Sequence, residues 1–300
     1  MRRRWPVILV ALSTSLISAI LTKAEESEPA SFHHVRLNVT DPAESIKFYE
    51  RVFGAVPVKY HGVADALFVE RSFILLNKVD TQPVSTLNTG IWHIGWGGVD
   101  VKNEYEWWKA RGVEFHTPLS PLPGRDNFYM YISGPNKELI EINTMGHHRF
   151  AHVHLFATDV NETAGWYARH LGLKPRRDNV PKPKGDMSTL GGIWMNFIQC
   201  DNVSIIIFGK PDQEPPPFWW PDPRLKELEP TQGRPIDHVA FSYRKIEPVL
   251  ERMKGAGVEI VQPITFDEQL KMKSFSVMGP DKVLIEFVEE KPIPEGIWDE

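Results

Sequence analysis

The stretch that decides the fold is "FHHVRLNVTD" (Phe32–Asp41), because the chain repeats it as "FAHVHLFATD" (Phe150–Asp159). The final aspartate of each copy opens a similar amphipathic segment, "DPAESIKFYERVFG" in the first and "DVNETAGWYARHLG" in the second. Each segment begins with a residue suited to cap a helix N-terminus and ends in a glycine suited to a C-terminal cap. The constant offset of 118 positions indicates an internal repeat of strand followed by helix.

A second pair of similar segments is offset by 145 positions. "GIWHIGWGGVDVKNEYEWWKARGVEF" resembles "PIDHVAFSYRKIEPVLERMKGAGVEI" and aligns His93 with His238. Further on, "SGPNKELIEIN" resembles "MGPDKVLIEFV" and aligns Glu141 with Glu286. The chain therefore contains four units of one plan, a strand, a helix and several short strands, over residues 32–79, 90–145, 150–209 and 235–290.

We predict an α+β fold of four βαβββ modules, which form two cup-shaped, barrel-like mixed sheets with the helices outside. The expected domains are residues 30–147, with modules one and two, and residues 148–290, with modules three and four. A Pro/Trp-rich insertion at 210–235 cannot be a core strand or helix, because its prolines lack backbone donors. It is either a linker or a lid whose Trp219 and Trp220 cover a cavity.

Composition restricts the partners. The net charge of -5 and pI of 6.1 give no reason to expect the clustered basic surface of a nucleic-acid-binding protein, so we expect no nucleic-acid partner. The single cysteine, Cys200, excludes an internal disulfide. No feature indicates a protein partner, and a small-molecule substrate is expected.

The N-terminus has the pattern of a targeting segment. Arg2, Arg3 and Arg4 precede the apolar run "WPVILVALSTSLISAIL", which is typical of a secretory signal over residues 1–24 with cleavage after Ala24. The run is also near the lower length limit of a membrane-spanning helix, so a retained anchor is the alternative. The expected location is secreted or periplasmic, with membrane attachment only if the segment stays uncleaved.

Side-chain alternation places the repeated histidines on one face of each sheet. Val35 and Leu37 should face the helix, whereas His34 and Asn38 face the hollow of the cup, so we expect no glycan on the Asn38 sequon. His33 falls out of this register and is expected at the surface. The same alternation directs six residues into the cups: His34, His93, Glu141, His152, His238 and Glu286.

These six residue types point to divalent metal sites. A carboxylate in such a hollow is costly to ionise unless it pairs or binds a cation. Two imidazoles and one carboxylate leave open coordination positions, which suits Fe(II) first and also Zn(II), Mn(II) or Ni(II). We expect one or two such ions.

Two assignments of the ligands follow from two ways of pairing the modules. Pairing one with two and three with four gives His34/His93/Glu141 and His152/His238/Glu286. Pairing one with four and two with three gives His34/His238/Glu286 and His93/Glu141/His152. We favour the consecutive pairing, because the duplication indicates a two-module unit that already functioned alone.

The motifs resemble those of the vicinal oxygen chelate superfamily, which includes glyoxalase I, bleomycin-resistance proteins and extradiol dioxygenases. The matching motifs are "HHVRLNVTD", "AHVHLFATD", "DHVAF", "GPNKELIEI" and "GPDKVLIEF", and the resemblance extends from Phe32 to Glu289. It implies paired βαβββ modules whose cup-shaped sheets surround a divalent metal. The family's ligand positions, a histidine in the opening strand and a glutamate in the closing strand, are occupied here by the six residues named above.

The resemblance implies three functions. A His-His-Glu set is the extradiol dioxygenase pattern, so an Fe(II) enzyme acting on a substrate with vicinal oxygens is the leading hypothesis. Tyr131, ahead of Gly134 and Pro135, fits the tyrosine of those enzymes, although the histidine that precedes it there is absent here. His154 is either a general acid or base or a hydrogen-bonding neighbour of a ligand.

The other two hypotheses are a glyoxalase-type lyase, isomerase or epimerase, and a non-catalytic protein that sequesters a small molecule. Glyoxalase I and the epimerases usually take a fourth ligand from the last strand of the odd modules. Those strands here, "SFILLNKV" and "VSIIIFGK", contain no Glu or Gln. The retained histidines and glutamates favour an enzyme over a sequestering protein.

Overall fold

The computed structural model describes residues 28–122, 127–175, 195–209, 221–222 and 224–290. The predicted signal or anchor segment lies outside these residues. Within the described part of the chain, no helix is both long and apolar enough to cross a membrane.

Each predicted unit has the expected order of a strand, a helix and three strands. Module one comprises β1 (Ser31–Val39), α1 (Pro42–Phe53), β2 (Val56–Tyr60), β3 (Ala64–Val69) and β4 (Ser72–Lys78). Module two comprises β5 (Ile91–Gly98), α2 (Val101–Lys109), β6 (Phe115–Pro121), β7 (Phe128–Ser133) and β8 (Leu139–Thr144). Module three comprises β9 (Phe150–Ala157), α3 (Val160–Leu171), β10 (Lys174–Pro175), β11 (Met195–Cys200) and β12 (Val203–Gly209). Module four comprises β13 (Ile236–Tyr243), α4 (Glu247–Gly255), β14 (Ile260–Asp267), β15 (Met272–Met278), the short 3-10 helix η1 (Pro280–Lys282) and β16 (Leu284–Glu289).

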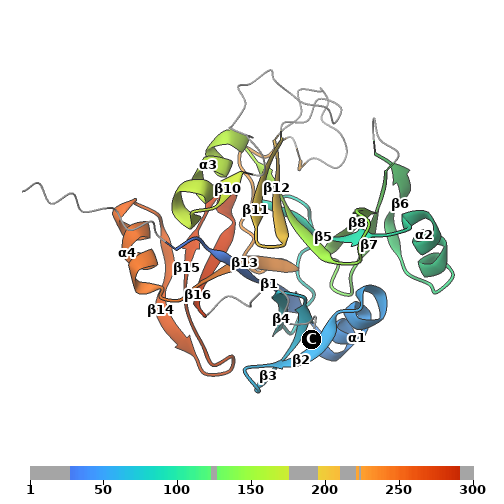
Figure 1. The fold of residues 1–300 in the computed structure, drawn as a ribbon, viewed down its shortest axis with the longest axis horizontal. Helices are drawn as coiled ribbons and strands as arrows, with labels where there is room; N and C mark the ends of the chain where they lie inside the picture. The colour runs from blue at the N-terminus through green and yellow to red at the C-terminus, as the bar shows by residue number, and fades with distance from the viewer. Residues whose placement is uncertain (1–27, 123–126, 176–194, 210–220, 223, 291–300) are drawn as a thin grey trace, which may run out of the picture.

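The strands form two curved mixed sheets of eight strands each (Figure 1). The first has the order β14-β15-β16-β13-β1-β4-β3-β2 and the second the order β10-β11-β12-β9-β5-β8-β7-β6. Inside each module the opening strand pairs in parallel with the closing strand, as β1 does with β4. The predicted α+β class with four βαβββ modules is confirmed.

The module pairing that we favoured is wrong for the sheets. β1 pairs antiparallel with β13, and β5 pairs antiparallel with β9, so module one joins module four and module two joins module three. The predicted segments 30–147 and 148–290 therefore each contribute strands to both sheets. The physical reason is that each opening strand has one free edge, which must be paired, and an alternating sequence does not specify its partner.

The helix caps follow the repeated sequence. Asp41 accepts hydrogen bonds from two backbone amides in the first turn of α1, and Asp159 does the same for α3. Both helices end at a glycine in the left-handed region, Gly54 with φ 67° and Gly172 with φ 68°. A residue with a Cβ would be strained in that conformation.

One apolar core lies on the helix side of both sheets. Val35, Leu37 and Val39 of β1 are fully buried there, as predicted, together with residues of β9 and of the helices α1 and α3. Where the two sheets meet, the ring centroids of Phe32 and Phe150 lie 6.0 Å apart. Because this face is filled, the opposite face of each sheet is left for the histidines.

Consecutive modules meet through a turn that docks on a helix start. Ahead of β8, Asn136 accepts a hydrogen bond from the Thr40 backbone N–H (2.9 Å) and donates one to Ser45 Oγ (3.1 Å). Asp281 has the equivalent place ahead of β16, where it accepts from Thr158 Oγ1 (2.6 Å). These hydrogen bonds connect module one to module two and module three to module four. Because the connected modules belong to different sheets, the bonds also join the two sheets.

The described end of the insertion runs beside the segment that connects modules one and two. The Glu229 backbone N–H donates to the carbonyl of Asn88 (2.8 Å), and Leu228 is buried. This part of the insertion behaves as an ordered linker. The hypothesis of a lid rests on Trp219 and Trp220, which lie outside the described residues.

The buried carboxylate of Glu138, in the turn ahead of β8, predicts that the stability of the fold depends on pH. Glu138 is buried, and its carboxylate accepts hydrogen bonds from the Tyr49 hydroxyl (2.8 Å) and the Asn136 backbone N–H (2.9 Å). Burial raises the pKa of Glu138 from an ordinary value near 4.5 to about 7, although these hydrogen bonds oppose the shift. Between these values the folded chain holds a proton that the unfolded chain has released. Glu138 should therefore lower the free energy of unfolding by about 3 kcal/mol as the pH rises from 4.5 past 7.

Glu138→Gln should remove this part of the pH dependence, because the amide resembles the protonated acid and does not titrate. Urea unfolding from pH 4.5 to 8 measures it, with the exposed Glu114→Gln as the control. Parallel stability curves for Glu138→Gln and the unmodified chain would contradict the prediction.

Candidate metal centres

In the first sheet, a β-bulge residue lies directly before each of the predicted histidine ligands, His34 and His238. In the ladder between β1 and β13, Phe32 lies opposite Phe241 and His34 opposite Ala240, which leaves His33 as the extra residue. A bulge interrupts the alternation of faces. The prediction that His33 is at the surface is therefore wrong, since this residue is 5% exposed and its ring lies next to that of His34.

The same kind of β-bulge occurs in β13, the strand that pairs with β1, and in the second sheet. Asp237 is the extra residue between the positions of Ile236 and His238 in β13. In the ladder between β5 and β9 the extra residues are Trp92 and Ala151. All four bulge residues immediately precede a predicted ligand, at equivalent places in the repeat.

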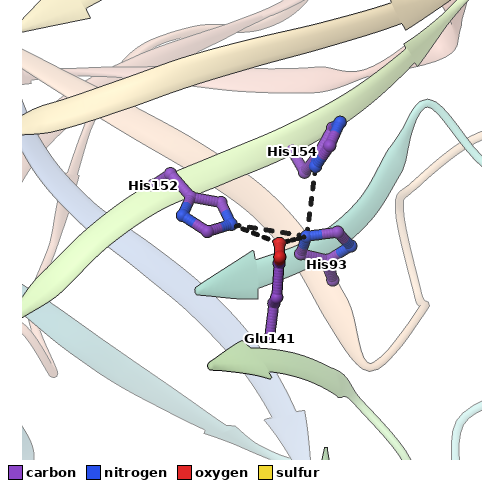
Figure 2. Close-up of side chains that lie close together, drawn as sticks. All are labelled: His93, Glu141, His152 and His154. Carbon is purple, nitrogen blue, oxygen red and sulfur yellow. Dashed lines mark hydrogen bonds and ion pairs between the residues drawn. The ribbon is translucent and has the colours of Figure 1, made fainter. Parts of the chain in front are cut away.

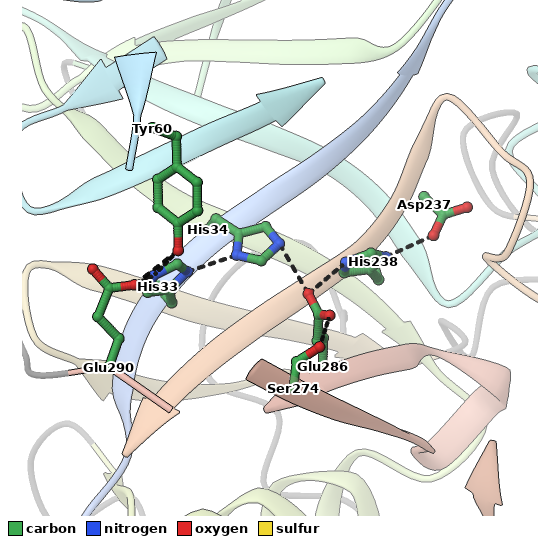
Figure 3. Close-up of polar contacts among 8 residues, drawn as sticks. All are labelled: His33, His34, Tyr60, Asp237, His238, Ser274, Glu286 and Glu290. Atoms are coloured by element: carbon green, nitrogen blue, oxygen red, sulfur yellow. Dashed lines mark hydrogen bonds and ion pairs between the residues drawn. The ribbon is translucent and has the colours of Figure 1, made fainter. Parts of the chain in front are cut away.

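The first centre consists of His34, His238 and Glu286, from β1, β13 and β16. The Nε2 atoms of His34 and His238 each lie 3.3 Å from Oε2 of Glu286. Oε1 of the same carboxylate accepts a hydrogen bond from Ser274 Oγ (2.6 Å), so one oxygen is directed at the two histidines (Figure 3). Asp237 contacts the outer side of His238, with 2.6 Å between Oδ1 and Nδ1.

The second centre consists of His93, Glu141 and His152, from β5, β8 and β9, with His154 beside them (Figure 2). Oε2 of Glu141 lies 2.8 Å from Nε2 of His93 and 3.0 Å from Nε2 of His152. Nδ1 of His154 is 3.1 Å from Nε2 of His93. The His152 ring lies against Gly95, where a Cβ would come within 2.1 Å of it, so only glycine fits opposite this ligand.

The charges at the second centre suit a cation. Burial raises the pKa of Glu141, but hydrogen bonding to His152 and His93 outweighs burial and holds the pKa well below its usual range. Burial lowers the pKa of His93 to about 4 and also lowers the pKa of His154. The cluster therefore holds an ionised Glu141 beside neutral His93 and His154, and these are the forms that bind a divalent metal.

At the first centre the two histidines differ. Burial lowers the pKa of His34 to about 3. Burial also acts to lower the pKa of His238, but Asp237 and Glu286 outweigh it and raise this pKa to about 9. A cation entering this centre would have to displace a proton from His238, which makes binding depend on pH.

The residues of both centres fit a divalent metal ion. At the second centre, one ligand atom from each of the four residues lies within 4.8 Å of the others, and the same holds for the three residues of the first. Nε2 of His34 is buried and makes no hydrogen bond among the described residues. A divalent cation bound between this nitrogen and the carboxylate of Glu286 would satisfy both groups.

The two sets of residues are those of the module pairing that we did not favour. The structure brings His34 together with His238 and Glu286, and His93 together with Glu141 and His152, and it separates His34 from His93. Both predicted catalytic residues accompany the second centre. Tyr131 pairs with Glu141 across β7 and β8, and its ring centroid lies 5.0 Å from that of His93.

Four residues around the first centre were missed by sequence reasoning: His33, Tyr60, Asp237 and Glu290. His33 and Asp237 are bulge residues inside β1 and β13, and Glu290 follows the end of β16, so strict alternation does not predict the face on which they lie. The adjacent pairs "HH" and "DH" were the available signal, because a bulge lets two successive side chains share a face.

Comparisons with known proteins agree with this fold. A search of curated proteins found no match. Glyoxalase I from Zea mays is similar over 87% of this chain and 92% of its own, with 17% sequence identity and a TM-score of 0.66. A dioxygenase candidate from Bacillus subtilis is similar over 91% of this chain and 88% of its own, with 13% identity and a TM-score of 0.57. At these identities the likeness concerns the fold alone.

A family model decides the membership. The model described as "Glyoxalase/Bleomycin resistance protein/Dioxygenase superfamily" matches residues 31–142 and again residues 149–287. These two matches cover most of the chain and contain all six predicted ligands. The chain therefore belongs to the glyoxalase/bleomycin resistance protein/dioxygenase superfamily, which confirms the resemblance seen in its repeated motifs.

Proposed function

We propose that the chain is an exported, divalent-metal-dependent enzyme with dioxygenase-like chemistry at the second centre. The observation that carries the proposal is the convergence of His93, His152 and Glu141, two imidazole nitrogens and one carboxylate oxygen, at one buried point. Bound there, Fe(II) would hold two adjacent oxygens of a small substrate and activate dioxygen in its remaining position.

The surroundings of the second centre favour an aromatic substrate. The rings of Trp92 and Phe156 stack at 4.8 Å, and Tyr131 lies 5.7 Å from Trp92. Phe208 meets the His154 ring edge-on at 4.1 Å. Aromatic side chains of this kind bind planar rings by stacking and edge contacts, so a catechol-like compound is the proposed substrate class.

Two residues beside the ligands can handle protons. His154 Nδ1 lies 3.1 Å from the ligand atom of His93, while its Nε2 has no hydrogen-bond partner among the described residues. We assign His154 the role of general acid or base. Tyr131 would donate its hydroxyl proton in a hydrogen bond to an oxygen of the bound substrate.

One observation favours a second candidate function, that of a lyase, isomerase or epimerase. His154 Nδ1 is close enough to serve as a fourth ligand together with His93, Glu141 and His152. With His154 as a fourth ligand, the ion would have fewer open positions than with three, and it would favour chelation of a substrate without addition of dioxygen. The role of His154 therefore separates the two kinds of chemistry.

Oxygen uptake tests the leading proposal. Protein purified without oxygen and loaded with Fe(II) should consume dioxygen when catechol is added. Glu141→Ala should abolish uptake, because it removes the anionic ligand of the second centre, whereas the matched Glu286→Ala at the first centre should retain it. Catechol binding without uptake would contradict the proposal and favour sequestration. Unchanged metal content in the double variant would refute both ligand sets.

His154→Gln separates the two roles of His154. If the residue moves protons, kcat should fall by about 10²- to 10⁴-fold while the iron content of the second centre stays the same. If the residue is a ligand, the affinity for Fe(II) should fall first. Titration with Fe(II) beside the kinetic measurement distinguishes these results, with Glu286→Ala as the parent chain so that only the second centre is read.

Export is the remaining part of the proposal. It is supported by the three arginines and the apolar run that follows them. In a secreting host the mature protein should begin at Glu25, and Leu9→Arg should keep the precursor inside the cell because a charge interrupts the apolar run. N-terminal sequencing of the secreted protein measures this. Recovery of the intact chain from the membrane fraction would favour the anchor.

A further inference from the structure

We propose that Glu290 and His33 form a positioning relay that fixes the tautomer and orientation of His34 and so preorganises the first centre for a metal ion. This inference rests on the proposed role of His34 as a metal ligand. It concerns two residues outside the ligand set, one from a bulge and one that follows the last strand.

The relay is a continuous series of short contacts (Figure 3). Oε2 of Glu290 lies 2.8 Å from Nε2 of His33. Nδ1 of His33 lies 2.7 Å from Nδ1 of His34. On its other side, His34 presents Nε2 to Glu286 at 3.3 Å.

The direction of each hydrogen bond follows from the first acceptor. An ionised carboxylate only accepts, so the His33 nitrogen that faces Glu290 carries a proton. In the relay that we propose, this is the only proton of the His33 ring, so Nδ1 of His33 accepts and Nδ1 of His34 donates to it. The remaining nitrogen of His34, Nε2, is left with a free lone pair directed at Glu286. Only this tautomer can bind a metal at that position.

Glu290 is itself held in place from another strand. The Tyr60 hydroxyl donates to the same Oε2 at 2.8 Å, and His61 Nε2 lies 3.5 Å from Oε1. Tyr60 is 2% exposed, and its ring is stacked on His61. The carboxylate thus has a defined position although it lies one residue beyond β16.

The second histidine of the first centre has a direct counterpart of this relay. Asp237 Oδ1 accepts from Nδ1 of His238, so the proton that a cation would displace from this ring is the one on Nε2, which faces Glu286. Asp237 Oδ2 accepts from the Gly233 backbone N–H (2.7 Å) and from Asn38 Nδ2 (2.9 Å). Both ligands of the first centre are therefore oriented by carboxylates, one directly and one through His33.

The second centre has the same bulges without this support. Its bulge residues are Trp92 and Ala151, and neither side chain can accept a proton from a ligand, because an indole N–H only donates and alanine is apolar. Nδ1 of His93 has no hydrogen-bond partner in the described part of the chain. The relay is thus specific to the first centre, and loss of such an outer partner commonly lowers metal affinity 10- to 100-fold.

Co(II) titration of the full chain tests the relay. The parent carries Glu141→Ala and His152→Ala, which remove two ligands of the second centre, so that the Co(II) absorption spectrum reports binding at the first. Glu290→Ala and His33→Phe should each weaken Co(II) binding by about 10- to 100-fold, and the double variant should be no weaker than the single ones, since both interrupt one series of contacts. Glu289→Ala, which removes the neighbouring carboxylate, is the matched control and should bind as the parent does.

A readout that needs no metal shows whether the effect acts through the tautomer. In ¹⁵N spectra of the histidine rings, His34 should carry its proton on Nδ1 in the parent and lose that preference in Glu290→Ala and His33→Phe. Unchanged Co(II) affinity with an unchanged His34 tautomer in both variants would overturn the relay alone. Absence of Co(II) binding in the parent would instead overturn the ligand assignment on which the relay rests.

Discussion

The antiparallel pairing of two opening strands is the interaction on which both centres depend. Each module supplies one candidate histidine ligand in its first strand and, in the even modules, one candidate glutamate ligand in its last. Neither module alone holds two imidazoles and a carboxylate. Where β1 meets β13, His34 and His238 come to opposite sides of Glu286, and β5 with β9 does the same around Glu141. The pairing of free strand edges thus builds the sites as well as the sheets.

The bulges convert this pairing into usable geometry. A regular antiparallel ladder would place successive side chains on opposite faces, and the residue before each histidine would then lie in the core. With an extra residue at His33 and Asp237, a second polar side chain reaches the cup face and contacts the ligand beside it. The core on the helix side remains apolar, since Val35 and Val239 keep their places there.

Much of this arrangement could be predicted from the sequence, and the parts that could not have a physical cause. The repeat, the caps at Asp41 and Gly54 and the alternation in "VRLNV" are local, and local rules gave the fold class and all six cup-facing residues. The partner of each free edge depends on contacts distant in the chain, which no local pattern specifies. The position of His33 escaped prediction because a bulge breaks the period on which the alternation argument rests.

The same kind of β-bulge therefore carries different side chains at the two centres. At the first centre the bulge positions hold His33 and Asp237, so the ligands are oriented through hydrogen bonds that end in carboxylates. At the second they hold Trp92 and Ala151, and the centroid of the Trp92 ring lies 4.9 Å from that of His154. The two centres thus differ at two positions outside the ligand set, and in our proposals one difference orients metal ligands while the other accompanies the substrate site. Since the bulges themselves are kept in both sheets, the duplicated centres could diverge without any change in the fold.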